Sequence, residues 1–131
     1  MRIKQFQGLV DELVMLLADS GIAYIAGYRA TPGPDYYKRY MSLQGVPNWC
    51  IEYNEKLRRQ HPPTSLWLTV YEKPSLSGLL SELTSVGFHQ GKQFLIPLKI
   101  PSGVEKEAVL TDLLSQVTEV SRRLVNQRIE S

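Results

Sequence analysis

The chain has 131 residues, of which 43% are hydrophobic and 21% charged, and its formal net charge is +2. These values predict one globular domain spanning residues 1–131 and exclude wholesale disorder. The small charge also excludes a protein held on nucleic acid by charge alone, because such binding scales with the number of phosphates neutralised. The single cysteine, Cys50, cannot form an intrachain disulfide. We therefore expect a cytoplasmic protein, and no run is long enough to span a membrane.

The first predicted element is a helix over about residues 4–20, where apolar residues recur at helical spacing. Gly21 follows at a position typical of a left-handed cap. The β-branched and aromatic run at 22–28 predicts a strand, and the Pro/Gly-rich run at 30–34 predicts a loop. Asp35 is a suitable cap for a short helix at 35–43.

The stretch from 48 to 60 is compatible with two structures. As a helix, it is capped by Asn48, and Glu52 pairs with Lys56 four residues later. As a strand, it places Trp49 and Tyr53 on one face. We favour the helix. If 48–54 is a strand instead, the order becomes α-β-β-β-α-β-α, which resembles the element order of small dimeric secretion chaperones.

The second half of the chain predicts alternating strands and helices. Residues 65–72 form the clearest strand, apolar on both faces and therefore central. A helix at about 75–86, capped by Ser75, precedes a strand at 93–100 whose Pro97 favours an edge or a bulge. The last helix begins with a capping box at 102–105 and extends to about 128.

This order, α-β-α-α-β-α-β-α, predicts an α+β or α/β domain. Its sheet has three or four strands with helices packed on it, and its C-terminal helix is long. A helix separates the second strand from the third, so the expected connection between them is a right-handed parallel crossover.

Aromatic and basic side chains are concentrated between residues 24 and 59, and this segment is the first candidate for function. Tyrosine and arginine combine a large contact area with hydrogen-bonding groups, which is typical of protein-binding surfaces. We interpret the segment as the contact surface of a small binding protein, with a weak nucleic-acid accessory role as an alternative. The candidate partner-binding residues are Tyr36, Tyr37, Lys38, Arg39, Tyr40, Trp49, Arg58 and Arg59.

A second hypothesis is a ligand-binding domain or an enzyme, with a site for an anion or a nucleotide at the carboxyl ends of the strands. Open α/β sheets bind ligands there, and helix N-termini with nearby cations attract anions. Helix capping alone also explains the serines at these positions. The candidate ligand-binding residues are Arg29, Thr31, Lys73, Ser75, Lys99 and Ser102.

The C-terminal helix carries apolar residues at alternating spacings of three and four, as in a coiled coil. This seam can pack within the chain or join two copies across a two-fold axis. We expect a homodimer. The candidate dimer seam consists of Leu110, Leu113, Val117, Val120 and Leu124.

Motifs for catalysis and cofactor binding are missing from the sequence. His61, His89 and Cys50 do not lie at metal-ligand spacing, and neither a phosphate loop nor a nucleophile elbow occurs. We assign no catalytic residue, metal or cofactor and favour binding over catalysis. The stretch 48–52 is similar to the tryptophan–cysteine–glutamate stretch of TIR domains, where the glutamate takes part in NAD cleavage. Glu52 is more simply explained as the partner of Lys56.

Overall fold

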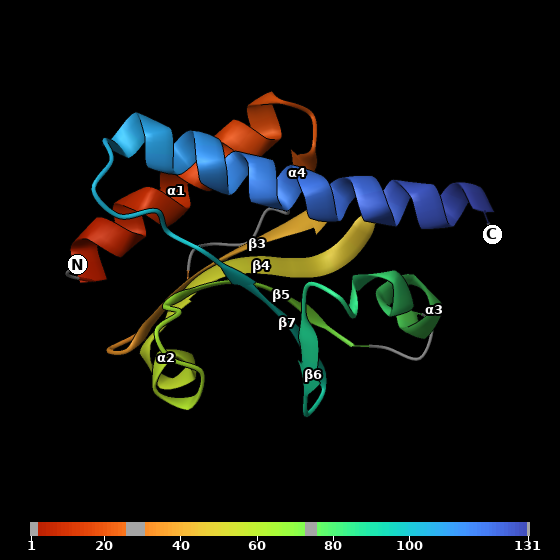
Figure 1. The fold of residues 1–131 in the computed structure, drawn as a ribbon, viewed down its shortest axis with the longest axis horizontal. Coiled ribbons are helices and arrows are strands. Elements are labelled where there is room, and N and C mark those ends of the chain that lie inside the picture. The colour runs from red at the N-terminus through yellow and green to blue at the C-terminus, as the bar shows by residue number, and fades with distance from the viewer. Residues whose placement is uncertain (1–2, 26–30, 73–75, 131) are drawn as a thin grey trace.

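The computed structural model describes residues 3–25, 31–72 and 76–130 of the chain. One antiparallel sheet carries the two long helices on one face and a short helix on the other (Figure 1). The elements are α1 (Ile3–Asp19), β1 (Ala23–Tyr24), β2 (Thr31–Pro32), β3 (Tyr36–Leu43), β4 (Val46–Asn54), α2 (Glu55–Gln60), β5 (Leu66–Tyr71), α3 (Ser77–Leu80), the 3₁₀ turn η2 (Ser81–Leu83), β6 (Phe88–Gln90), β7 (Gln93–Leu98) and α4 (Lys106–Glu130).

Within the described residues the sheet already has seven strands, so the predicted three or four strands are wrong. Six of them follow the order β1-β3-β4-β5-β7-β6, and β2 pairs separately with β3. Every pairing is antiparallel, including β5 with β7. The expected parallel crossover from β5 to β7 is therefore also wrong. The helical segment α3 and η2 leads from β5 to β6, which runs parallel to β5 on the far side of β7, and the hairpin between β6 and β7 then reverses the chain.

Three elements occur where the apolar periodicity predicts them: α1, β5 and α4. Gly21 ends α1 at φ +74°, and the Ile22 N–H donates to the Leu17 carbonyl at 3.1 Å, as in a left-handed helix cap. β5 lies inside the sheet between β4 and β7, which explains why both of its faces are apolar. Of the strand expected at 22–28, Ala23 and Tyr24 form β1, and residues 26–28 lie outside the described part.

The expected helix at 35–43 is wrong, because this segment forms β3. Residues four apart share a face in both a helix and a strand, so the spacing of Tyr37 and Met41 fits both. The decisive feature is the turn at Gln44 and Gly45, whose φ values are +52° and +79°. Two consecutive residues with positive φ form a tight hairpin turn, which pairs β3 with β4.

The helix favoured over 48–60 is correct only in its second half. Residues up to Asn54 form β4, because this segment gains a strand partner on each side, β3 and β5. Asn54, rather than Asn48, caps the short helix α2, and its side-chain oxygen accepts from the Leu57 N–H at 3.0 Å. Glu52 is consequently not placed one helical turn from Lys56.

β7 lies inside the sheet, and its Pro97 is tolerated because β6 is shorter. The Glu72 N–H donates to the Lys92 carbonyl, so the backbone N–H and carbonyl groups of the even-numbered residues of β7 point toward β5. The backbone nitrogen of Pro97 points the other way, toward the β6 side. β6 pairs with β7 only as far as Leu95. The ring nitrogen of Pro97 therefore lies on a local edge, and the side chain of Gln116 bonds both the N–H and the carbonyl of Lys99 just beyond it.

The remaining helices start later than expected. α3 begins at Ser77, and Ser75 lies outside the described residues. α4 begins at Lys106, so residues 102–105 form a bend that precedes the helix.

The main core lies between the sheet and the layer of α1, α3, η2 and α4. Large side chains from all of these elements are fully buried there, and a smaller cluster under α2 occupies the opposite face. The centre of the main core includes Leu13, Leu17, Trp49, Leu68, Leu83, Phe94, Leu113 and Val117.

Candidate functional site

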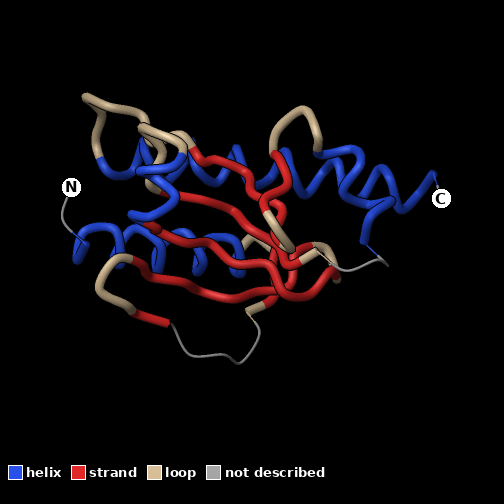
Figure 2. The backbone as a smooth tube through the Cα atoms, turned by 90° about the horizontal axis from the view of Figure 1, so that it is seen from below, coloured by secondary structure: helices blue, strands red, loops and turns tan. Residues whose placement is uncertain are grey.

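The side chains of β3 alternate between the two faces of the sheet, and this alternation divides the tyrosine-rich segment. Tyr37 and Met41 belong to the main core under α1 and α4. Tyr36, Lys38 and Tyr40 therefore point to the opposite face. We call this the outer face; it is the side on which α2 lies, and Figure 2 views the molecule from that side.

Cross-strand pairing brings polar residues of β4 and β5 beside those of β3, because directly opposed residues share a face. Lys38 is opposite Glu52, and Tyr40 is opposite Cys50. Cys50 is in turn opposite Thr69 of β5. The outer face thus brings a lysine, a carboxylate, a thiol and two hydroxyls into adjoining positions.

The centre of this group is buried, although no helix of the main layer covers it. Glu52 is 1% exposed, and its Oε2 lies 3.6 Å from the Lys38 Nζ and 3.3 Å from the Asn54 Nδ2. The Cys50 Sγ lies 2.8 Å from the Thr69 Oγ1, and both side chains are buried. Each buried polar side chain in the centre therefore has a bonding partner.

Burial and neighbouring charges together fix the charge state of two of these groups. Burial, followed by the charge of Glu52, raises the pKa of Cys50 to about 12, so the thiol is neutral at physiological pH. Burial lowers the pKa of Lys38, but the charges of Glu52, Cys50 and Tyr40 outweigh it and the net pKa is raised. Lys38 is therefore a stable cation, and Cys50 is not an activated nucleophile.

Aromatic rings surround the buried centre. Tyr24 of β1, opposite Ser42, is 75% exposed, and Tyr71 at the end of β5 is 54% exposed. Tyr36 and Tyr40 are partly buried, and the Lys38 Nζ lies 5.2 Å from the centroid of the Tyr36 ring. The outer face therefore presents exposed and partly buried tyrosine rings around a buried polar centre in which Lys38 and Glu52 are paired.

The other part of the outer face is closed by α2. Leu57 packs with Trp67 and Leu95, and Phe88 adds to this cluster. Arg58 and Arg59 stand exposed on α2, and they form ion pairs with Glu55 and Asp35 respectively. These two arginines lie at the rim of the outer face with their charges already compensated, which weakens the case for phosphate binding.

Three of the predicted partner-binding residues lie on the wrong face for that role. Tyr37 and Trp49 are buried in the main core, so they cannot contact a partner directly. Arg39 points the same way, and its Nη1 and the Tyr37 hydroxyl both donate to Asp11 Oδ1 at 2.6 Å. Burial, followed by the bond to Asp11, raises the pKa of Tyr37, so the hydroxyl remains protonated. Tyr37 and Arg39 thus join β3 to α1.

The predicted dimer seam packs within the chain. Leu113, Val117, Val120 and Leu124 are buried against the sheet and the neighbouring helices, and Leu110 packs at the margin of the core. A second copy cannot occupy this face of α4. The reason is that both long helices pack on the same face of the sheet and contact each other, so the apolar side of α4 is covered within the chain.

The described members of the predicted ligand site, Thr31, Lys99 and Ser102, do not come together at one end of the sheet. β5 and β7 run in opposite directions, with Leu66 opposite Leu98 and Tyr71 opposite Gln93, so their carboxyl ends lie at opposite ends of the sheet. Lys99 and Ser102 are exposed after β7, and Thr31 lies in β2 beside Lys38. Arg29, Lys73 and Ser75 lie outside the described residues.

The histidines bond to neighbouring polar side chains rather than forming a cluster. His89 Nδ1 lies 3.0 Å from Glu72 Oε2, and His61 Nε2 lies 2.7 Å from Gln90 Oε1. Within the described ranges, no group of three or more histidine, cysteine or carboxylate residues could hold a metal ion. The same residues include no helix that is both long and apolar enough to cross a membrane.

A scan against known protein families, a search of curated proteins and a search of solved structures each found no match to this chain. The similarity in element order to secretion chaperones therefore gains no support from a matching structure. The local similarity to TIR domains also has no matching family or structure behind it. In addition, Glu52 is buried beneath Lys38 and closed to a substrate.

Two exposed tyrosines of the outer face, Tyr24 and Tyr71, are absent from the candidate residues that the sequence predicted. Tyr24 belongs to the aromatic segment, but its exposure depends on β1 lying at the edge of the sheet. Tyr71 follows the buried Val70 at the end of β5, and strand alternation alone would have placed it opposite the core. The role of Glu52 was missed because its partner, Lys38, comes from a strand predicted as a helix.

Proposed function

We propose that this chain is a small binding protein and that a partner protein docks on the outer face of the sheet, beside α2. The observation that supports this most is the pair of exposed rings, Tyr24 and Tyr71, on the same face as Tyr36, Lys38 and Tyr40. Isolated exposed apolar residues are common, but several tyrosines gathered on one open sheet face are typical of a contact surface.

The chemistry of the outer face favours a partner with apolar side chains and hydrogen-bond acceptors. Each tyrosine offers a flat ring and a hydroxyl, and few rotatable bonds are immobilised when it is contacted. Three cations of the face are already paired: Lys38 with Glu52, Arg58 with Glu55 and Arg59 with Asp35. A polyanion would have to displace these pairs, so a protein fits better than nucleic acid.

The buried centre supports binding rather than catalysis. Cys50 carries a neutral thiol bonded to Thr69, and Glu52 is held between Lys38 and Asn54. Both reactive groups are closed to solvent, so a substrate could not reach them without rearrangement of the sheet. The reduced, buried state of the single cysteine also fits the cytoplasm, where we place the protein.

Site-specific photocrosslinking tests the proposal in the cells that produce the protein. Tyr24 and Tyr71 are replaced separately by benzoylphenylalanine, and Thr118, exposed on α4, receives the same group as a control. We expect both outer-face positions to capture the same protein, identified by mass spectrometry, and the Thr118 position not to capture it.

Binding to that captured protein, once purified, is then measured by calorimetry. Tyr24→Ala and Tyr71→Ala should each weaken the affinity about tenfold, since truncating a well-placed interface tyrosine costs about 1–2 kcal/mol. Both side chains are exposed, so the melting temperature should stay unchanged. Equal capture at Thr118, or unchanged affinity in both alanine variants, would show that the outer face is not the contact surface.

A further inference from the structure

A row of exposed residues runs along α1 on the side away from the sheet. We call it the α1 stripe, and it consists of Lys4, Gly8, Glu12, Met15 and Asp19. Their spacings of three or four residues place them on one helical face. The outer face lies on the opposite side of the sheet, so the α1 stripe is separate from the proposed partner surface.

The charges at the two ends of the stripe are on the wrong ends of the helix. Lys4 lies in the first turn of α1, where the helix dipole favours an anion, and Asp19 is the last residue, where it favours a cation. Among the described residues, neither side chain has an ion-pair partner. If a second α1 lies antiparallel to the first, each Lys4 lies beside an Asp19 of the other copy, and both charges gain a partner of opposite sign.

Gly8 and Met15 fit the same arrangement. A Cβ built at Gly8 meets nothing within 4 Å, so packing inside the chain does not explain a glycine in the middle of a helix. Met15 is 49% exposed, and methionine is a flexible side chain that adapts to a contact surface. In an antiparallel pair, the Met15 side chain of one copy can lie over the space at Gly8 of the other.

The Lys4–Asp19 contact and the Gly8–Met15 contact require the same alignment of the two antiparallel helices. Lys4 and Asp19 are equally distant from a point between Asp11 and Glu12, and so are Gly8 and Met15. A two-fold axis at that point satisfies all four residues in both copies. The acids closest to the axis are already neutralised, Asp11 by Arg39 and Glu12 by Lys106 at 2.9 Å.

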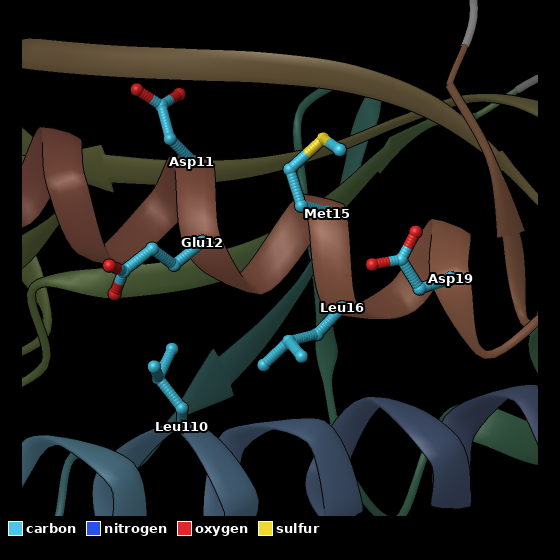
Figure 3. Close-up of a pocket in the computed structure, with 6 residues that line it drawn as sticks. All are labelled: Asp11, Glu12, Met15, Leu16, Asp19 and Leu110. Carbon is cyan, nitrogen blue, oxygen red and sulfur yellow. The ribbon is translucent and has the colours of Figure 1, made fainter.

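We propose that two copies of this chain associate through their α1 stripes, antiparallel about a two-fold axis, with Lys4 paired to Asp19 and Met15 seated at Gly8. Hollows beside the stripe leave space for the flanking side chains of the second copy. One of about 380 Å³, lined by Leu16 and Leu110, separates α1 from α4, and Figure 3 shows these two side chains pointing across it. Another, of about 710 Å³, adjoins Lys4 and Gly8.

Sedimentation equilibrium of the purified full chain over a wide concentration range tests the association. Wild type is expected to show a monomer–dimer equilibrium. Lys4→Glu and Asp19→Lys should each weaken it at least about tenfold, because each places like charges together twice in the symmetric dimer. Mixing the two variants should form a heterodimer at about the wild-type affinity, since every charged contact is then complementary.

Matched controls are Lys56→Glu and Glu82→Lys, which make the same charge changes at exposed positions outside α1. Their self-association should equal that of wild type. Gly8→Leu provides a steric test and should abolish the dimer while circular dichroism shows a folded protein. A wild-type chain that remains monomeric, or charge variants that fail to form a heterodimer when mixed, would overturn the proposal.

Discussion

Removing the positive charge above Glu52 should destabilise the fold strongly, because that carboxylate is 1% exposed. We choose Lys38→Met, which keeps a flexible apolar stem and deletes the ammonium 3.6 Å from Glu52 Oε2. Losing one partner of a fully buried ion pair costs about 3–5 kcal/mol. The Lys38 side chain is 24% exposed, so water replaces part of the lost interaction. We therefore expect the free energy of unfolding to fall by about 2–3 kcal/mol.

Urea denaturation followed by tryptophan fluorescence measures this loss, since Trp49 and Trp67 are both buried. Glu52→Gln and the double variant complete a mutant cycle, and the double variant should be about 1–2 kcal/mol more stable than the sum of the single effects predicts. Arg59→Met is the control, because its pair with Asp35 is exposed and at 4.0 Å should be worth less than about 0.5 kcal/mol. A Lys38→Met loss no larger than the control, or an additive cycle, would refute the reasoning.

Three further perturbations follow from the same structure. Because the pKa of Cys50 is raised from 9.0 to about 12 in the folded state, the folded protein keeps a proton that the unfolded chain releases, and the free energy of unfolding should fall as the pH rises through this range. Urea titrations at several pH values measure this fall, and Cys50→Ala should flatten it. Gly8→Ala should raise the free energy of unfolding by about 0.5–1 kcal/mol in thermal denaturation; a decrease would show that the helix needs the glycine. Gln116→Ala should speed deuterium exchange of the Lys99 amide, whose N–H donates to the Gln116 side chain at 2.9 Å, and unchanged exchange would argue against that cap.

The two proposed surfaces have a joint consequence. The α1 stripe and the outer face lie on opposite sides of the sheet, so a dimer formed through α1 would leave both outer faces open. We expect such a dimer to bind two partner molecules and to gain avidity where the partner is itself multivalent. Either proposal can fail alone, because the self-association assay contains no partner and the crosslinking assay does not require the dimer.

Apolar periodicity was enough to locate the elements with one dominant pattern. α1 and α4 show helical spacing over several turns, and β5 is a short apolar run bounded by polar residues. In these segments only one secondary structure buries the apolar residues, so local sequence and tertiary packing agree.

The segment from 35 to 54 was decided only by the tertiary structure. Its spacing of four suits a helix and a strand alike. The strands are selected by the hairpin turn at Gln44 and Gly45 and by the pairing of β4 with β5, which lies more than ten residues further along the chain. That same choice assigns Tyr37 and Trp49 to the core and Tyr36, Lys38 and Tyr40 to the outer face. Sequence by itself therefore determined which rings and charges the chain contains. Only the register of the sheet, set by long-range hydrogen bonds, determined which of them can meet another molecule.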